Sequence, residues 1–438
     1  MPHLRRVFAA CLLVCAPLAA EIRSLTILHV NDMHARLMPL ENGHGGFAYL
    51  AAAIKHEREG CKDCILVHAG DVAQGTPVST IFRGLPVFGI ANMMGFDAGC
   101  LGNHDFDYGW PQTRNFMLAA SYPIVSANIV NDRGELFTPE SYVILNVNGL
   151  RVAVIGAMTD DLHNLSTPNL LQQWHTLPAV ATVRKVAAEA RTKSDIVVLL
   201  AHITPDEEKE ILHSATEVPV MVTGHAHRGI TEAASYEGRV MVRVKGYGEE
   251  LGRLELKVDT EKKAPVGWSW KHIVVDSKTI EPDPQVAAAV KHWEGEVTNR
   301  VDQPLAVAKR SFTRQEVKQL IEQALREETG ANFAHMNQGG VRDILPAGQL
   351  TLRHIWNIMP FDNEVVVGTF KGSELPEVVV GSQPVDPGAE YTLAVSDFTA
   401  ANQSTPENLR TTGLQFPKDV GLMRDLLIDW FRKKKVLE

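Results

Sequence analysis

The residues best suited to chemistry are histidines, aspartates and one asparagine that recur in short groups along the first half of the sequence. Imidazole, carboxylate and amide oxygen are the ligands that borderline divalent transition metals accept. In Asp32/His34 and His225/His227 the partners are two positions apart, so an extended backbone would point both side chains the same way. The candidate metal ligands are Asp32, His34, Asp71, Asn103, His202, His225 and His227.

Two cations about 3.5–4 Å apart hold a hydroxide, polarise phosphoryl oxygens and stabilise an in-line displacement. A single carboxylate, Asp71, can bridge both cations and reduce their mutual repulsion. Isolated histidines such as His29 and His68 are interpreted as structural and receive no role. The pattern therefore indicates metal-assisted hydrolysis of a phosphate ester.

These groups follow short apolar runs, a pattern typical of strands buried on both faces of a sheet. Helical stretches such as 48–57 and 183–191 lie between several runs, which predicts a layered α/β domain. Ligands of open α/β sheets gather at the carboxyl ends of the strands, so side chains from five such ends can converge. The predicted strands are Leu25–Val30, Cys64–Ala69, Ala98–Leu101, Ile124–Ala127, Val152–Ile155, Ile196–Ala201 and Val218–Thr223.

At 438 residues the chain is too long for one ordinary core, which predicts two domains. Residues 1–20 have a positive start and an apolar stretch too short to span a bilayer, so we interpret them as the signal peptide of a secreted or periplasmic protein. We expect a catalytic domain at 21–262, a linker and connecting helix at 263–300, and a second α/β domain at 301–438. No later stretch is apolar enough to predict a stable membrane anchor.

The net charge of -9 excludes a global attraction to nucleic acid or anionic lipid, so a small phosphate ester is the expected partner and a nucleic-acid polymer is not. Beyond the predicted signal peptide three cysteines remain. Cys61 and Cys64 can form a disulfide in an oxidising compartment, although plain thiols or a redox pair are alternatives. Cys100 lies between apolar and glycine residues and is expected in the core.

Asp-x-His, Gly-Asp, Gly-Asn-His-Asp and Gly-His-x-His, in this order, resemble the signature of calcineurin-like metallophosphoesterases. Together with a second domain they resemble the 5′-nucleotidase / UDP-sugar hydrolase family. The resemblance implies a four-layer α/β/β/α sandwich, a smaller α/β substrate-binding domain, and two divalent metals such as Zn, Mn, Co or Fe. It implies one metal at Asp32, His34, Asp71 and His227, and the other at Asp71, Asn103, His202 and His225.

The same resemblance implies a catalytic pair, with His104 stabilising the transferred phosphoryl group and the leaving oxygen, and Asp107 orienting it. A carboxylate that accepts from one imidazole nitrogen fixes the tautomer and supports the imidazolium, which agrees with this assignment.

In the second domain, Asn337-Gln-Gly-Gly-Val-Arg342 resembles the family's substrate-holding loop, and an arginine fork suits a phosphate or carboxylate. Phe361 and Phe398 fall where relatives place two rings around a base, although both are also candidates for core residues. Arg310 or Arg314 supplies a further positive charge. The family's glycine-rich acidic run after the second aromatic is missing, which weakens the case for ribose recognition.

The sequence favours hydrolysis of a nucleoside monophosphate at its 5′ ester. Other enzymes of the same metal chemistry remain open: a nucleotide-sugar diphosphatase, a 2′,3′-cyclic nucleotide phosphodiesterase or a thiosulfate-ester hydrolase. A nucleotide-binding protein without catalysis is the alternative from another class, and the complete ligand set argues against it.

Overall fold

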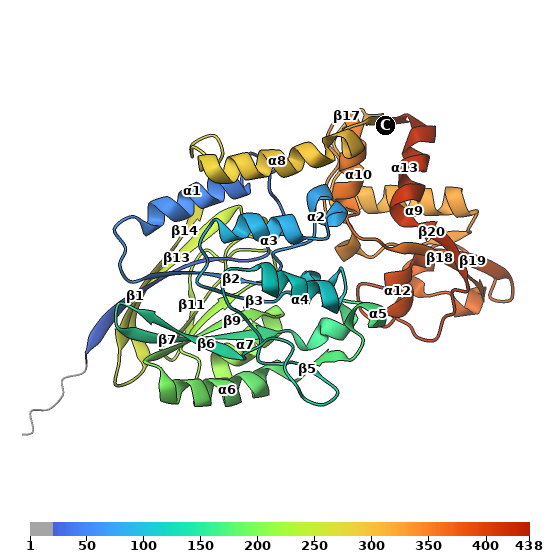
Figure 1. The fold of residues 1–438 in the computed structure, drawn as a ribbon. Coiled ribbons are helices and arrows are strands. Elements are labelled where there is room, and N and C mark those ends of the chain that lie inside the picture. Colours follow the sequence, from blue (N-terminus) through green and yellow to red (C-terminus); the bar gives the residue numbers. More distant parts are fainter. Residues whose placement is uncertain (1–20) are drawn as a thin grey trace, which may run out of the picture.

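The computed structural model describes residues 21–438, so the predicted signal peptide at 1–20 lies outside the described residues. Two six-stranded sheets stack on each other in the first part of the chain (Figure 1). The first sheet has the order β14-β13-β1-β2-β3-β4. Strands β1, β2, β3 and β4 run parallel to one another. Its strands are β1 (Ile22–Val30), β2 (Cys64–Ala69), β3 (Ala98–Cys100), β4 (Ile124–Val125), β13 (Glu250–Asp259) and β14 (Ala264–Val274).

The second sheet has the order β11-β12-β10-β9-β7-β6, with β7, β9, β10 and β12 parallel. Every residue of β9 is buried, which explains why its sequence is an unbroken apolar run ending in a histidine. The strands are β6 (Tyr142–Val147), β7 (Leu150–Met158), β9 (Ile196–His202), β10 (Val220–Thr223), β11 (Ala234–Tyr236) and β12 (Arg239–Val242). A separate two-stranded sheet joins β5 (Ile129–Asn131) to β8 (Trp174–Thr176).

Helices cover both outer faces of the stacked sheets, which gives the predicted four-layer α/β/β/α sandwich (Figure 1). An apolar core of valines, leucines and isoleucines fills the space between the sheets, and each fully buried side chain of this kind contributes about 1.5–3 kcal/mol. The helices of this part are α1 (Phe47–Arg58), α2 (Pro77–Ile81), α3 (Leu85–Asn92), α4 (Trp110–Ala119), α5 (Pro168–Leu171), α6 (Ala179–Lys193) and α7 (Pro205–Ser214).

The long helix α8 (Pro284–Val301) connects this sandwich to the rest of the chain. The linker is expected from residue 263, yet Ala264–Val274 form β14, which pairs antiparallel with β13. The reason is that tryptophans at alternate positions, Trp268 and Trp270, pack against the core between the sheets. The charged turn at 260–263 thus joins two strands of one sheet.

The last part of the chain contains a three-stranded sheet of order β17-β15-β21 and a four-stranded sheet of order β16-β19-β18-β20. Helix α9 begins with a capping box, in which the Thr313 hydroxyl accepts from the Glu316 amide, and ends at Gly330 in the left-handed conformation. The elements are β15 (Pro304–Ala308), α9 (Arg314–Thr329), β16 (Phe333–Ala334), β17 (Gly348–Thr351), α10 (Leu352–Ile358), β18 (Glu364–Lys371), α11 (Glu377–Val380), β19 (Glu390–Ser396), α12 (Asp397–Ala401), β20 (Lys418–Leu422), α13 (Met423–Lys434) and β21 (Val436–Leu437).

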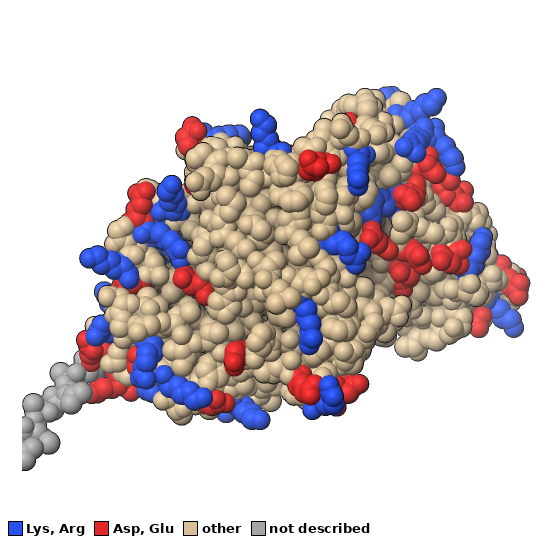
Figure 2. Space-filling model, viewed as in Figure 1, with Lys and Arg blue, Asp and Glu red and all other residues tan. Residues whose placement is uncertain are grey.

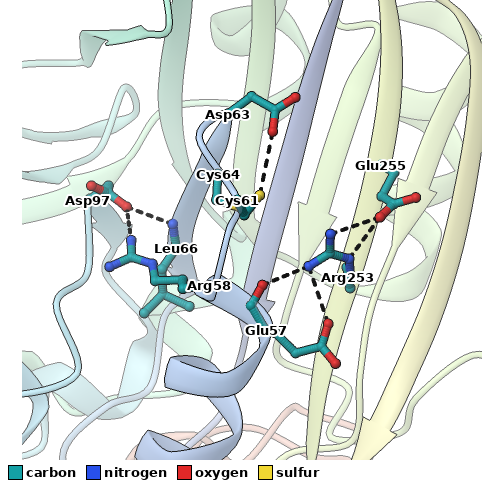
Figure 3. Close-up of a disulfide and its surroundings, with 9 residues drawn as sticks. All are labelled: Glu57, Arg58, Cys61, Asp63, Cys64, Leu66, Asp97, Arg253 and Glu255. Carbon is teal, nitrogen blue, oxygen red and sulfur yellow. Dashed lines mark hydrogen bonds and ion pairs between the residues drawn. A yellow bond between two sulfur atoms is a disulfide. The ribbon is translucent and has the colours of Figure 1, made fainter.

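Cys61 and Cys64 form a disulfide in the turn between α1 and β2 (Figure 3). Nearby ion pairs hold the same corner, with Arg58 bound to Asp97 and Arg253 bound to both Glu57 and Glu255. Cys100 is a buried free thiol, as expected.

Charged side chains of both signs alternate around the rim of the molecule in the view of Figure 2, whereas the face over α3 and α4 is largely uncharged. Within residues 21–438, no helix has both the length and the apolar character needed to cross a membrane.

Candidate active site

The structure brings the seven predicted metal ligands together from five loops at the ends of β1, β2, β3, β9 and β10. Both sheets direct the carboxyl ends of these parallel strands to the same edge of the sandwich, which is why residues almost 200 positions apart meet. Six of the seven ligands follow their strands directly in the loops, and His202 is the last residue of β9. All of them are buried or nearly so.

One group consists of Asp32, His34, Asp71 and His227, whose ligand atoms all lie within 4.8 Å of one another. Asp71 has the central place, because its Oδ2 lies 3.5 Å from His34 Nε2 and 3.2 Å from His202 Nε2. The first of these imidazoles belongs to one predicted metal set and the second to the other. Asp71 therefore stands where a shared carboxylate has to stand.

The second group is built around the side-chain oxygen of Asn103. This Oδ1 lies 3.0 Å from His202 Nε2 and 3.0 Å from His225 Nδ1. The His202 ring is fixed from behind, since its Nδ1 lies 2.9 Å from the carbonyl oxygen of Ala69 and donates to it. That bond directs Nε2 at Asn103 and Asp71.

Five of the seven residues have a left-handed backbone. In the two pairs Asp32/His34 and His225/His227 it replaces the extended conformation expected from their spacing. The φ angles are 51° at Asp32, 47° at His34, 51° at Asp71, 74° at His225 and 55° at His227. Aspartate and histidine tolerate this region better than most residues, but each such position still costs about 1–3 kcal/mol. Backbone conformations of this kind cluster at functional sites, where surrounding structure enforces them.

Glycines next to these residues allow the loops to approach each other. A Cβ atom at Gly102 would lie 2.1 Å from Asp71 Oδ1, and one at Gly70 would lie 2.6 Å from His202 Nδ1. No other residue fits at either position, which explains the glycine that precedes Asp71 and the one that precedes Asn103.

Burial and neighbouring charges hold three of the four ligand histidines in the neutral form that a metal ligand needs. For the fourth, His202, burial lowers the pKa, but the charge of Asp71 outweighs it and raises the pKa to about 9. Burial, followed by the positive charge of Arg342, lowers the pKa of His227 to about 2. Burial, followed by His202, lowers the pKa of His225 to about 3, and burial also lowers the pKa of His34. For Asp71, burial raises the pKa, but the imidazoles of His202 and His104 outweigh it and hold the pKa well below its ordinary value.

The donor set fits divalent cations, because imidazole nitrogens and a carboxylate oxygen face one another. His34 Nδ1 donates to the carbonyl oxygen of Gln74 at 3.2 Å, so its Nε2 is an acceptor. That Nε2 lies only 2.9 Å from His227 Nε2. In the described chain Asp71 Oδ2 is buried without a hydrogen-bond partner. Two nitrogen lone pairs and a carboxylate oxygen directed at one point are stabilised by a positive ion.

The two predicted catalytic residues, His104 and Asp107, are in direct contact beside this cluster. His104 Nδ1 lies 2.8 Å from Asp107 Oδ2, and the His104 amide donates to Asp71 Oδ1 at 2.9 Å. Burial raises the pKa of Asp107, an effect that His104 opposes. The imidazole ring of His104 stacks on the ring of Phe361, with 5.7 Å between the two centroids.

Two further residues matter here that sequence reasoning missed. Asp105 is buried, and its carboxylate accepts from the amides of Val72, Ala73 and Gly102, which ties the loop of Asp71 to the loop of His104. Tyr247 places its hydroxyl 3.2 Å from His227 Nδ1. Asp105 could have been found from the sequence, because it is the last residue of the motif Gly102-Asn-His-Asp105. Nothing local in the sequence marks Tyr247.

The second domain reaches the cluster through Arg342, which donates from Nη2 to His34 Nε2 at 3.2 Å. Its guanidinium lies 5.9 Å from the ring centroid of Phe361, so two of the four predicted substrate residues stand at the metal ligands. Asn337 is buried in the same loop, and Phe398 is half-buried at the start of α12.

The structure separates the two arginines between which the sequence left a choice. Arg314 donates from Nε to the carbonyl oxygen of Val341 at 2.7 Å, beside Arg342. Arg310 is bound instead to Glu316 at 2.7 Å and lies over the ring of Phe312. Arg314 is the arginine next to the substrate loop.

Known proteins with the same features support this description. Residues 25–229 match the calcineurin-like phosphoesterase family, and residues 294–380 match the 5′-nucleotidase C-terminal domain. An endonuclease of Bacillus subtilis is 27% identical over 86% of this chain, and the chain spans about a third (34%) of that relative's length. A 5′-nucleotidase of Vibrio vulnificus is 24% identical, with 86% of this chain and 79% of that protein covered. The crystal structure of a 5′-nucleotidase precursor from Thermus thermophilus has a TM-score of 0.85 at 23% identity, covering 95% of this chain and 97% of that one.

Fold and site together match the class of calcineurin-like, metal-dependent phosphoesterases. Within that class the two matched regions occur in the order expected from the sequence. The chain carries a calcineurin-like phosphoesterase region followed by a 5′-nucleotidase C-terminal region, and in this combination it is similar to the 5′-nucleotidase / UDP-sugar hydrolase family.

Proposed function

We propose that the protein is a secreted 5′-nucleotidase that releases phosphate from nucleoside monophosphates with the help of two divalent cations. The observation that carries the proposal is the position of Asp71, whose unpartnered Oδ2 lies between His34 and His202, one from each predicted metal set. The name of the Vibrio relative supports a nucleotide substrate.

One cation would be held by Asp32, His34, Asp71 and His227, and the other by Asp71, Asn103, His202 and His225. When bound, such a pair supplies an activated water and polarises the phosphoryl oxygens. The chain contributes the fixed arrangement of the ligands, because the loops are locked by the Asp105 carboxylate and by the bond between His202 and Ala69.

His104 acts through its Nε2 atom in this proposal. Asp107 accepts a hydrogen bond from Nδ1, so the proton of the imidazolium that is available for transfer lies on Nε2. The Nε2–H group of His104 stabilises the negative charge of the phosphoryl group and gives its proton to the leaving 5′ oxygen. The position of Phe361 against the ring restricts its rotation.

The second domain binds the rest of the substrate. Arg342 lies next to the ligands, where its planar fork suits a phosphate, and Arg314 adds a second positive charge behind the loop. Phe361 offers a ring face for a base, with Phe398 as the second aromatic.

A substrate panel tests the proposal most directly. Purified protein with Mn²⁺, Zn²⁺ or Co²⁺ should release phosphate from 5′-AMP faster than from UDP-glucose, 2′,3′-cyclic AMP or bis(p-nitrophenyl) phosphate, and EDTA should abolish the release. Preference for a cyclic or diphosphate substrate would reassign the enzyme within the same chemistry. Phosphate release that EDTA does not affect would contradict the metal centre.

Secretion is part of the proposal because residues 1–20 have the features of a signal peptide, and the Cys61–Cys64 disulfide suits an oxidising compartment. Expression of the full chain in a Gram-negative host should yield periplasmic protein whose first residue is Glu21. Recovery of uncleaved protein in the cytosol would contradict this part.

A further inference from the structure

Arg36 is a buried cation that the proposed chemistry does not use. Only 7% of it is exposed, and its guanidinium faces the second domain. Nη1 donates to Asp343 Oδ2 at 2.8 Å, and Nη2 lies 3.5 Å from the carbonyl oxygen of Arg342. A buried guanidinium needs a partner, and here that partner comes from a residue more than 300 positions away.

The ion pair stands beside a second contact between the same two segments. His34 meets Arg342, and two residues later Arg36 meets Asp343. Two neighbouring contacts fix the orientation of the substrate loop relative to the ligand loop, whereas a single contact would let it pivot. The Arg36–Asp343 ion pair uses none of the histidine nitrogens that would bind a cation. It therefore holds the loop of Arg342 both with and without cations at the ligand cluster.

Arg36 also lies against Tyr247, with its Cζ atom 5.4 Å from the ring centroid. The Tyr247 hydroxyl is 3.2 Å from His227 Nδ1, and the Tyr247 amide donates to the carbonyl oxygen of Asp32 at 2.6 Å. A ligating histidine is normally oriented by a hydrogen bond from its other ring nitrogen. Tyr247 accepts that bond here and is itself packed by Arg36.

We propose that Arg36, Asp343 and Tyr247 are positioning residues that form one interdomain latch. The Arg36–Asp343 ion pair holds the loop of Arg342 over the ligand cluster, and Tyr247, packed under Arg36, orients His227. The proposal rests on the proposed function for the identity of the ligands and of the substrate loop. In this proposal the three residues link the position of the second domain to the arrangement of the ligand cluster.

The ion pair is tested with Asp343→Asn, which keeps the size of the side chain and removes its charge. Spin labels at Leu118→Cys, which is 84% exposed on α4, and at the exposed Lys371→Cys at the end of β18 report the interdomain distance in the full chain. Asp343→Asn should broaden the distance distribution and raise KM about tenfold, with bound metal and kcat nearly unchanged. Asp343→Glu should restore a narrow distribution.

The matched control is Asp195→Asn, which removes the ion pair of Asp195 with Arg151 inside the first sandwich. It should leave the distance distribution as in the wild type. If Asp343→Asn also leaves the distribution and KM unchanged, the latch is refuted.

Tyr247→Phe tests the other arm by metal binding, because phenylalanine keeps the ring under Arg36 and removes only the hydroxyl. Loss of such an outer partner typically weakens metal binding 10–100-fold, so Mn²⁺ titration should show at least a tenfold weaker dissociation constant. Equal Mn²⁺ affinity would overturn this role. Neither the distance measurement nor the titration needs turnover, so an inactive wild type would refute the proposed function and leave the latch to be judged separately.

Discussion

The metal-ligand cluster and the substrate face differ in how their residues are held. All seven predicted ligands come from strand ends and the adjoining loops of one sandwich, and hydrogen bonds among these segments fix them. The predicted substrate residues belong to another part of the chain, where Arg342 contacts the predicted ligand His34 and Phe361 stacks on His104 beside the cluster. A site built within one core is specified by strand ends, whereas a site shared between two domains also depends on how those domains meet.

The largest expected effect comes from the centre of the cluster. Asp71→Asn should reduce phosphate release to background and lower bound metal, because the carboxylate shared by both ligand sets is lost. Metal content by mass spectrometry and turnover of 5′-AMP check this, with the exposed Asp132→Asn as a control. Full activity with a full complement of metal would contradict the role of Asp71 as the shared carboxylate at the centre of the ligand cluster.

Next in size is the catalytic pair. His104→Ala should lower kcat by roughly 10²–10⁴, the contribution typical of a positioned proton donor. Metal content should stay unchanged, because His104 is not among the predicted ligands. A decrease in bound metal that parallels the loss of kcat would place His104 in the cluster rather than beside it.

A smaller effect is expected from the substrate face. Phe361→Ala removes the ring that stacks on His104 and is proposed to hold a base. An aromatic contact is worth about 0.5–1.5 kcal/mol beyond burial, which corresponds to roughly a 2- to 10-fold higher KM for 5′-AMP. The KM for p-nitrophenyl phosphate, which carries no base, should change less. An equal change for both substrates would show that the ring supports the ligand cluster and not the base.

The last effect concerns stability, leaves activity at neutral pH unchanged, and sharpens the view of the first sandwich as a tightly buried unit. Burial, followed by His202, lowers the pKa of His68 to about 3 from its ordinary value of 6.5. Between pH 3 and 6.5 the His68 side chain is protonated in the unfolded chain but not in the folded one. The contribution of His68 to the free energy of unfolding therefore falls as the pH drops below 6.5, and it does not change with pH above that value. The slope is about 1.4 kcal/mol per pH unit.

His68→Leu should therefore flatten the acid side of the stability profile by about that amount. Urea unfolding at pH 7, 6 and 5 measures it, with the exposed His163→Gln as a control. An unchanged slope would mean that His68 does not become protonated on unfolding in this range.

Much of this arrangement follows from local sequence. The apolar run before His202 predicts a strand, and β9 ends at that residue. Asp71 and Asn103 follow their strands in the same way. These features were predictable because strand burial and loop position depend on neighbours in the chain.

Other features depend on contacts between distant segments and were not predictable. The extended backbone expected at His225 and His227 is replaced by left-handed turns, since packing of the loops against each other decides φ there. Arg36 has no special context in the sequence, and its partner Asp343 is known only once the two domains are placed together. The strand β14 was missed because a charged turn resembles the start of a linker.

The left-handed turns at the ligands have a consequence for assembly. The packing of the loops enforces this backbone, because the glycines at 70 and 102 leave no room for a side chain, and each strained position costs about 1–3 kcal/mol. Chelation should accordingly strip the ions and leave circular dichroism in the far ultraviolet almost unaltered.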